Sequence, residues 1–342
     1  MYVNRRLSRK QVLFFSLYSF VPAGLWASFI YLLYAYGGLE FIKIPFLPIA
    51  TIGTAVAFYV GFKNNAAYER FWEGRKIWGA IVNASRTWGT DVMSYVDVGD
   101  ESERAQQTRE ELIYRHMAWM NALRLQLRKN SRFFNKPARA TKKRLENHAE
   151  AMRNDWDTEI SGFLSPEEFE EVTKMANSAT HLLTEQGKQL AQLVKEGRMD
   201  LFHQIAMMEV VEELYTHQGK CERIKNTPFP RFYAEYSRIF VRVFVFLLPF
   251  GMLDVFTSHL EAATTTYQTL IPIIPMIAAS GLVTWVFFTM ESVGDATEDP
   301  FERSMNDVPM NALCRTIEID MRQMLGETDL PPKEAPIDNI LY

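Results

Sequence analysis

Three residues at helical spacing form the most distinctive chemical pattern in this chain of 342 residues. Thr54, Phe58 and Phe62 stand at positions i, i+4 and i+8, so a helix places them in one stripe. Small residues, which let helices approach closely, form a second stripe beside it: Gly53, Ala57 and Gly61. Together the stripes indicate identical helices around a narrow apolar passage, which controls small ions by its radius and by loss of water. The alternative is that the phenylalanines face lipid or a protein core.

The width of such a passage follows from helix geometry. Five helices whose axes are about 9 Å apart lie on a circle with a radius of about 8 Å. Subtracting a helix radius of about 5–6 Å leaves an opening of roughly 2 Å, which is the size of an ion. Four helices would nearly close the opening, so the pattern favours five copies around one axis.

The stripe lies within one of three long stretches without charged side chains or histidine. These stretches are 11–39, 44–62 and 262–290. A helix needs about 20 mostly apolar residues to cross a bilayer, so three such runs exclude a purely soluble protein. We expect a fourth span over 233–259, around the apolar segment 243–253, because an even number of spans keeps the charge-rich middle of the chain on one side.

Basic residues set the orientation, because they gather at the cytoplasmic ends of membrane helices. They precede the first run and follow the second: Arg5, Arg6, Arg9 and Lys10, then Lys63, Arg70, Arg75 and Lys76. We therefore expect a multi-pass protein of the plasma (inner cell) membrane with both termini in the cytoplasm.

The second span is too long for its membrane. No proline follows Pro48 before about Val96, so the rod that starts near Ile44 has roughly 50 residues and a length of about 75 Å. The bilayer core takes only about 30 Å of this length, and the rest must project into the cytoplasm. Apolar residues at helical spacing in 105–130 and 203–219, and a helix start at Ser165, predict a helical region there.

These patterns predict an all-α membrane protein with four transmembrane helices continuous with a helical cytoplasmic domain. The expected parts are 1–98 with the first two spans and the cytoplasmic extension of the second, 99–230 as the cytoplasmic helical region, 231–292 with spans three and four, and 293–342 as a C-terminal segment that packs on the helical region. Its last 14 residues, from Asp329, are expected to be loosely ordered.

Composition excludes several other classes. With 37 Lys and Arg against 41 Asp and Glu, the net charge of −4 argues against nucleic-acid binding. Two cysteines rule out a disulfide framework, and the six histidines lack metal-ligand spacing. We find no glycine-rich phosphate loop and no nucleophile–base motif, so we expect neither an enzyme nor a resident cofactor.

Residues 61–89 resemble the signature of the bestrophin family, particularly its prokaryotic branch. Residues 298–321 resemble the family's region after the last span, and 227–233 its entry to the third span. The residues that carry the motif, which we interpret as assembly residues, are Tyr68, Arg70, Trp72, Glu73, Arg75, Pro228, Pro230 and Tyr233. The resemblance implies a homopentameric channel with one axial pore that conducts chloride and related anions, with other copies of the chain and membrane lipids as its partners.

The resemblance also implies positions for the family's functional residues. The apolar neck maps onto Thr54, Phe58 and Phe62, and a second, cytoplasmic constriction maps onto Val211. Animal members hold calcium in an acidic clasp after the last span. Here that region offers Asp299 and Asp307, whereas Ser304 replaces another acid. Calcium needs about six to eight oxygen ligands, so these residues predict at most a weak site.

Two questions remain open in the sequence. Lys63, Asn64 and Asn65 follow the neck directly and would either contact a partly dehydrated ion or cap and bridge subunits. The outer connectors carry Glu40, Asp254 and Glu261 against Lys43, which gives a net charge of −2 per copy. Five copies would carry about −10, and this charge would favour cations such as Na⁺ or K⁺.

A different class of function is a membrane-anchored helical scaffold that binds a partner protein.

Overall fold

Helices account for the architecture of the computed structural model, which describes residues 1–7, 9–129, 146–147, 152–257, 271–304 and 306–342. In chain order they are α1 (Arg9–Ala35), η1 (Glu40–Ile42), α2 (Phe46–Tyr95), α3 (Glu103–Arg128), α5 (Trp156–Ile160), η3 (Ser161–Phe163), α6 (Pro166–Lys174), α7 (Ser178–Lys195), α8 (Leu201–Asn226), α9 (Arg231–Phe256), α11 (Ile273–Thr297) and α12 (Met310–Met324). Across these residues, β pairing is limited to two isolated bridges, Tyr2 with Ile340 and Ile337 with Ile340. The predicted all-α class is confirmed.

The chain divides into two compact units. We call residues 4–69 and 229–298 the apolar unit, and residues 1–3, 70–228 and 299–342 the polar unit. Helix α2 contributes its first half to the apolar unit and its second half to the polar unit.

Helix α2 begins at Phe46 and ends at Tyr95, close to the limits predicted from the sequence. Its N-terminus is capped by a side chain from α9. The Asp254 carboxylate accepts the Phe46 N–H at 3.2 Å and so satisfies one of the free N–H groups of the first turn. A carboxylate is also favoured at this position by the positive end of the helix dipole.

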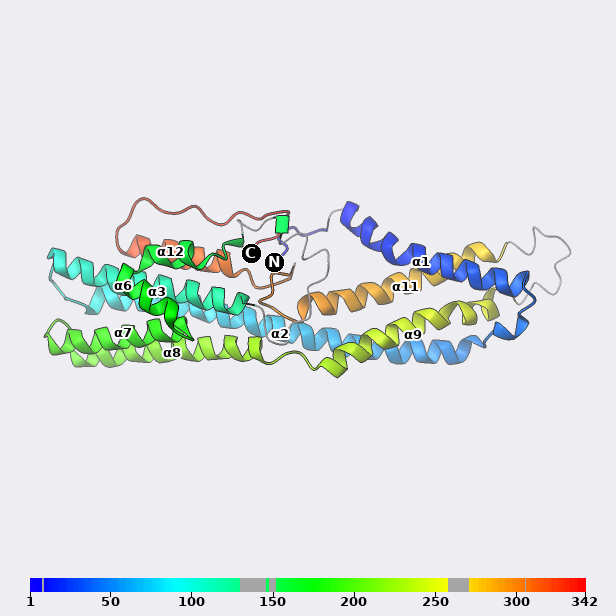
Figure 1. Ribbon diagram of the computed structural model, residues 1–342, viewed down its shortest axis with the longest axis horizontal. Helices are drawn as coiled ribbons and strands as arrows, with labels where there is room; N and C mark the ends of the chain where they lie inside the picture. Colours follow the sequence, from blue (N-terminus) through cyan, green and yellow to red (C-terminus); the bar gives the residue numbers. More distant parts are fainter. Residues whose placement is uncertain (8, 130–145, 148–151, 258–270, 305) are drawn as a thin grey trace. The chain divides into compact units, whose positions relative to one another are not determined.

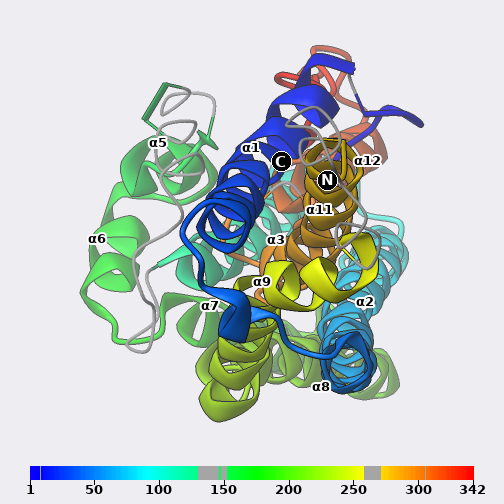
Figure 2. The ribbon, with the colours of Figure 1, turned by 90° about the vertical axis from the view of Figure 1, so that its right-hand side faces the viewer.

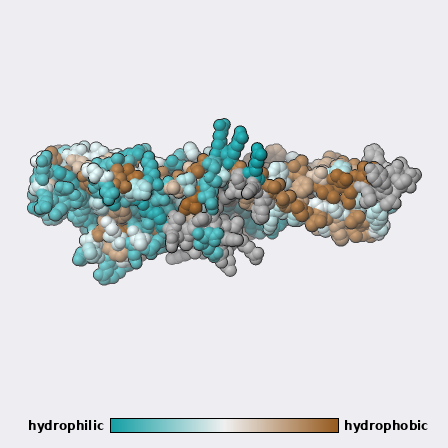
Figure 3. Space-filling model, turned by 90° about the horizontal axis from the view of Figure 1, so that it is seen from above, coloured by the Kyte–Doolittle hydropathy of each residue, from teal (hydrophilic) through white to brown (hydrophobic). Residues whose placement is uncertain are grey.

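Four helices among the described residues are long and apolar enough to cross a membrane: Phe15–Ala35, Glu40–Tyr95, Arg231–Phe256 and Ile273–Thr297. This agrees with the four spans expected from the sequence. Within the apolar unit, α11 packs against both α1 and α9, and these helices run side by side in Figure 1. The face drawn in Figure 3 has mainly apolar residues over this unit and mainly hydrophilic residues over the polar unit.

The last candidate span extends past the charge-free stretch that predicted it. We expected 262–290, whereas α11 runs from Ile273 to Thr297 and includes Glu291 and Asp295. Residues 258–270 lie outside the described part of the chain. Both carboxylates are paired with basic groups of the same unit, which explains how a helix that carries two acids continues in apolar surroundings.

Helix α3 is the centre of the polar unit. It packs against α5, α7, α8 and α12, and Figure 1 shows α7 and α8 side by side, whereas Figure 2 looks along the helices. Large aromatic side chains fill the core, with Trp78, Trp88 and Trp119 fully buried. The helix start expected at Ser165 is confirmed, because the Ser165 hydroxyl accepts the Glu168 N–H at 3.2 Å.

Buried polar groups fix the C-terminal end of α3. The Arg124 guanidinium is fully buried and donates to Glu159 and to the Asn311 side-chain oxygen, both at 2.6 Å. Arg128 donates to the same Asn311 oxygen at 2.5 Å and to the Met152 carbonyl at 2.9 Å. These bonds tie α3 to α5 and α12.

The end of the chain differs from the expectation of a loosely ordered tail. Ile340 and Tyr342 are buried together with Met152. The Tyr342 carbonyl accepts the Ala312 N–H at 2.9 Å. The Leu341 N–H donates to the Met1 carbonyl at 2.8 Å, so both ends of the chain lie together in the polar unit. For residues 340–342 this expectation does not hold, because apolar residues there pack on elements that are far away in sequence.

We expect Glu159→Gln to destabilise the polar unit by about 3–5 kcal/mol, because it leaves the buried Arg124 charge without its carboxylate. Thermal unfolding of the purified protein measures this loss. Glu170→Gln is the control, because it breaks an exposed pair with Lys174 and should leave the melting temperature nearly unchanged. Equal melting temperatures for the two variants would contradict a stabilising role for the buried ion pair between Arg124 and Glu159.

Candidate functional site

The predicted stripe on α2 points away from the rest of the apolar unit. Phe58 and Phe62 are each 65% exposed, and Thr54 is exposed on the same face. The Thr54 hydroxyl donates to the Ala50 carbonyl of its own helix at 3.0 Å. Its hydrogen is therefore engaged, and the face offers two aromatic rings, a methyl group and an oxygen.

The two glycines of the neighbouring stripe have different surroundings. A Cβ atom at Gly53 would lie 2.6 Å from the Phe244 ring, so this position lets α9 of the same chain approach α2. Among the described residues, nothing lies within 4 Å of a Cβ atom at Gly61, which is exposed. The close contact expected between copies therefore has no support at Gly53.

Lys63 and Asn64 turn inward, against the expectation that they contact ions or bridge subunits. The Lys63 side chain is 0% exposed and pairs with Glu291 at 3.4 Å and with Asp295 in closer contact. Asn64 donates to the Met290 carbonyl at 2.8 Å. All three partner residues lie on α11 of the same chain, so neither side chain is available to an ion or to another copy.

Asn65, the third residue of this group, is exposed. Its side chain donates to Glu69 on the same helix at 2.8 Å. The structure therefore leaves its predicted contact with an ion or another subunit open.

Arg238 on α9 joins the charges that surround Lys63. Its guanidinium lies 3.2 Å from Asp295 and 3.7 Å from Glu291. Two basic and two acidic groups thus meet where α2, α9 and α11 come together. This balance reduces the penalty for holding charges in an apolar unit.

Two motif residues in the second half of α2 bind the end of α8 within the polar unit. Arg70 donates to the Ile224 carbonyl and lies 3.7 Å from Asp299. Glu73 accepts a hydrogen bond from Arg223 at 2.6 Å. These contacts lie inside one chain, so the role of both residues in assembly stays a prediction.

The remaining α2 motif residues are more accessible. Tyr68 and Trp72 are exposed, and Arg75 is half-buried. Their expected role in assembly stays a prediction.

The proline pair lies between α8 and α9. Helix α8 ends at Asn226, and Pro230 is the N-cap residue of α9, so the segment around Pro228 cannot continue a helix. Tyr233 packs its ring on Tyr59 with 4.7 Å between ring centroids, and its carbonyl accepts the Tyr59 hydroxyl at 3.4 Å. This contact fixes the start of α9 on α2 inside the apolar unit.

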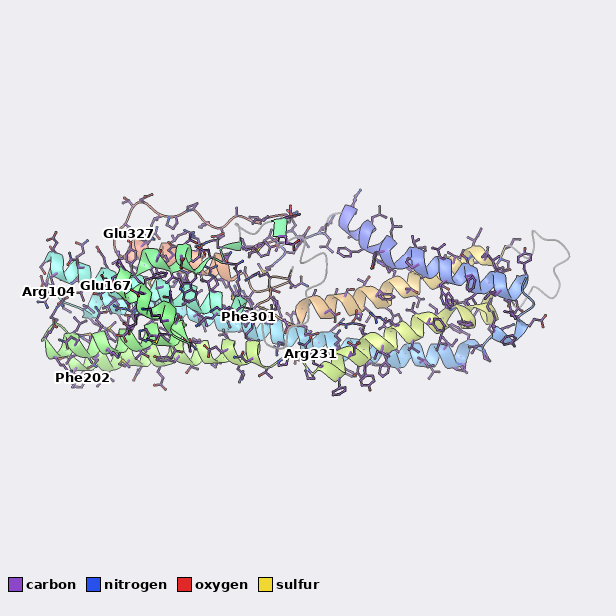
Figure 4. All side chains as sticks on the ribbon, viewed as in Figure 1. Arg104, Glu167, Phe202, Arg231, Phe301 and Glu327 are labelled. Carbon is purple, nitrogen blue, oxygen red and sulfur yellow. The ribbon has the colours of Figure 1, made fainter. Side chains whose placement is uncertain are left out.

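The position predicted for a cytoplasmic constriction is wrong. Val211 is only 1% exposed and belongs to the core of the polar unit, so it cannot line a passage. The exposed apolar residues at the start of α8 are Leu201, Phe202 and Ile205. Phe202, labelled in Figure 4, is 78% exposed. The N-cap signal of Asp200 marks the start of this exposed segment.

The acidic stretch after α11 does not converge on one point. Asp299 is paired with Arg70, and Glu302 forms an ion pair with Lys225. Asp307 accepts a hydrogen bond from the Ser304 hydroxyl. Complete burial raises the pKa of the Asp307 carboxyl to about 6. Over the described residues, no group of three or more His, Cys, Asp or Glu side chains is arranged to hold a metal ion.

Acidic residues at the other end of the apolar unit are partly neutralised. Asp254 lies 3.6 Å from Lys43 and caps α2, so its charge is compensated locally. Glu40 is exposed. Glu261, the third acid of the predicted outer group, lies outside the described residues.

Comparisons with known proteins place this fold in a family. The family described as bacterial/fungal bestrophin protein matches residues 12–323. The voltage-dependent anion channel-forming protein YneE of Salmonella typhi is 28% identical over 298 residues, which covers 86% of this chain and 82% of the relative. The voltage-dependent anion channel-forming protein mll4386 of Mesorhizobium japonicum is 28% identical over 295 residues, covering 86% and 79%.

A solved structure shares the fold. The bacterial bestrophin homologue from Klebsiella pneumoniae matches with a TM-score of 0.72 at 24% identity, over 94% of this chain and 100% of that one. The family match extends from α1 into α12 and includes both the aromatic stripe and the charged group around Lys63. The chain therefore belongs to the bacterial/fungal bestrophin family.

Proposed function

We propose that this chain forms an ion channel that passes chloride and other small anions. The observation that carries this proposal is the exposed stripe of Thr54, Phe58 and Phe62 on a helix whose neighbouring charge, Lys63, is turned inward. Such a face is apolar and carries no fixed charge, as a neck that works by radius and loss of water requires. The relatives' names describe proteins that form anion channels.

The passage requires several copies, because one helix face cannot enclose a lumen. Five α2 helices around an axis leave an opening of roughly 2 Å, so we propose a homopentamer. Basic residues flank the first two spans, and such residues gather on the cytoplasmic side of a membrane. We therefore propose that the apolar unit lies in the inner membrane and the polar unit in the cytoplasm. In this arrangement α2 carries the lining from the bilayer into the cytoplasm.

Aromatic rings give the neck its preference among ions. The edge of a phenylalanine ring carries partial positive charge and attracts anions, whereas its face attracts cations. We propose that the rings of Phe58 and Phe62 present their edges to the axis. Thr54 is smaller than a large aliphatic residue at the same position would be. This end of the neck is therefore wider or more hydrated.

A preference for cations is the competing assignment within the same fold. Its support is the exposed carboxylate of Glu40, together with Glu261 outside the described residues. Asp254 adds less to the field at the mouth than a free carboxylate would, because Lys43 and the first turn of α2 compensate it.

Calcium does not fit the residues after α11. Asp299 and Glu302 are engaged by Arg70 and Lys225, and one oxygen of Asp307 is engaged by Ser304. Six to eight converging oxygen ligands are about the number that calcium requires. We therefore propose that ion passage through this channel needs no bound calcium.

We expect Phe58→Ala to raise the unitary conductance about twofold or more, because it widens the neck and lets water enter. Purified protein in a planar lipid bilayer, in symmetric KCl, provides the measurement. Phe29→Ala is the matched control, because Phe29 is an exposed phenylalanine of the same unit on α1. Silence of both the wild type and Phe58→Ala would favour a membrane-anchored scaffold that binds a partner protein.

In asymmetric NaCl, we expect the reversal potential to lie close to the chloride equilibrium potential. Glu40→Gln should move it only slightly, because the ring edges and not the outer carboxylates select the ion. A wild-type reversal potential near that of sodium, with a clear loss of this preference in Glu40→Gln, would establish the cation alternative.

Asp307→Asn should stabilise the protein near pH 8 and have little effect near pH 4. The folded state raises the pKa of Asp307 to about 6, above the ordinary value of about 3.9. Folding therefore favours the protonated acid, and this contribution is complete below about pH 4 and lost as the pH rises through about 6. The expected gain near pH 8 is about 2–3 kcal/mol.

Melting temperatures at the two pH values measure this difference. Asp320→Asn serves as the control, because its carboxylate forms a partly exposed pair with Arg86. If Asp307→Asn had the same effect at both pH values, this would refute the raised pKa of the buried Asp307 carboxyl.

A further inference from the structure

A group of four charged side chains lies inside the apolar unit and joins three of its helices. Lys63 comes from α2, Arg238 from α9, and Glu291 and Asp295 from α11. The group is electrically balanced, and its centre, the Lys63 side chain, is fully buried. Charges that are removed from water in apolar surroundings hold their partners firmly, because separating them leaves an uncompensated charge.

The position of Lys63 in the sequence connects this group to the aromatic stripe. Lys63 follows Phe62 directly, and successive residues of a helix point about 100° apart. Lys63 therefore forms its ion pair with α11, while the Phe62 ring faces outward from the same turn of α2. Any rotation of α2 about its axis that moves one of these side chains moves the other by the same angle.

A close contact between Asn64 and Gly294 beside the ion pairs restricts this rotation further. A Cβ atom at Gly294 would lie 2.2 Å from the Asn64 side-chain oxygen, so a larger residue at 294 would displace the Asn64 side chain. From the same side chain, the Asn64 amide donates to the Met290 carbonyl at 2.8 Å. Lys63 and Asn64 thus hold adjacent points of one turn of α2 against α11.

We propose that Lys63 is a positioning residue of the channel. Its ion pairs with Glu291 and Asp295 set the rotation of α2 and thereby the radius of the ring that the Phe62 side chains form. Arg238 extends the same link to α9. This inference rests on the proposed function, since it assigns Lys63 a role in shaping a neck that the ion passes and Lys63 never touches.

Unitary conductance of purified pentamers in planar bilayers tests the proposal. Lys63→Met keeps much of the side-chain volume and removes the charge. We expect its conductance to change by about twofold or more, with several amplitudes replacing one, because the five rings no longer share a fixed setting. Lys63→Arg keeps the charge and should retain one amplitude close to that of the wild type.

Exchanging the charges separates positioning from a general loss of structure. Lys63→Glu alone leaves Arg238 as the one base of the four-residue group against three acids and should alter the conductance strongly. Combining Lys63→Glu with Glu291→Lys restores the net charge of the group but not its contacts with Asp295 and Arg238, so we expect the conductance to return only part of the way to that of the wild type. Glu235→Gln is the control, because Glu235 is exposed and contacts Arg238 but not Lys63.

Wild-type conductance and a single amplitude in assembled Lys63→Met would overturn the proposal. If Lys63→Met does not assemble, Asp295→Asn decides, because it weakens the group and leaves Glu291 on Lys63. A changed amplitude in that variant supports the role, and an unchanged one refutes it. Silence of the wild type together with Phe58→Ala would instead refute the proposed function itself, so the two failures are distinguishable.

Discussion

The pairing of Lys63 with Glu291 and Asp295 is the constraint on which the membrane part of this protein depends. A charge in apolar surroundings is tolerated only with an opposite partner, and both partners of Lys63 come from another helix, α11. The first charges after two of the apolar stretches, Lys63 after 44–62 and Glu291 after 262–290, are the residues that meet. Both helices can therefore continue beyond those stretches without a break.

Features that depend on local sequence could be predicted. The bounds of α2, the helix start at Ser165 and the four spans follow from apolar length, from capping residues and from the spacing of prolines. The exposed stripe of Thr54, Phe58 and Phe62 also follows from helical spacing alone. Such patterns are readable because the residues that define them lie within a few turns of one another.

Features that depend on distant partners could not be predicted. Lys63 and Glu291 are separated by 228 positions, so nothing near Lys63 shows that it faces inward. Helix α8 has apolar residues on several faces, and spacing alone does not tell that Val211 belongs to the core while Phe202 is exposed. The chain end was misjudged for the same reason, because Tyr342 packs on Met152.

The inward turn of Lys63 also shapes how the proposed channel treats ions. A fixed positive charge in the neck would bind anions tightly and slow their release, whereas conduction requires binding that is weak enough for the ion to leave. Lys63 is neutralised by α11, and in the channel that we propose the edges of the Phe58 and Phe62 rings supply the weak positive charge that attracts anions. The ion pairs that hold α2 in place thus also leave the proposed passage without a fixed charge that would bind anions tightly.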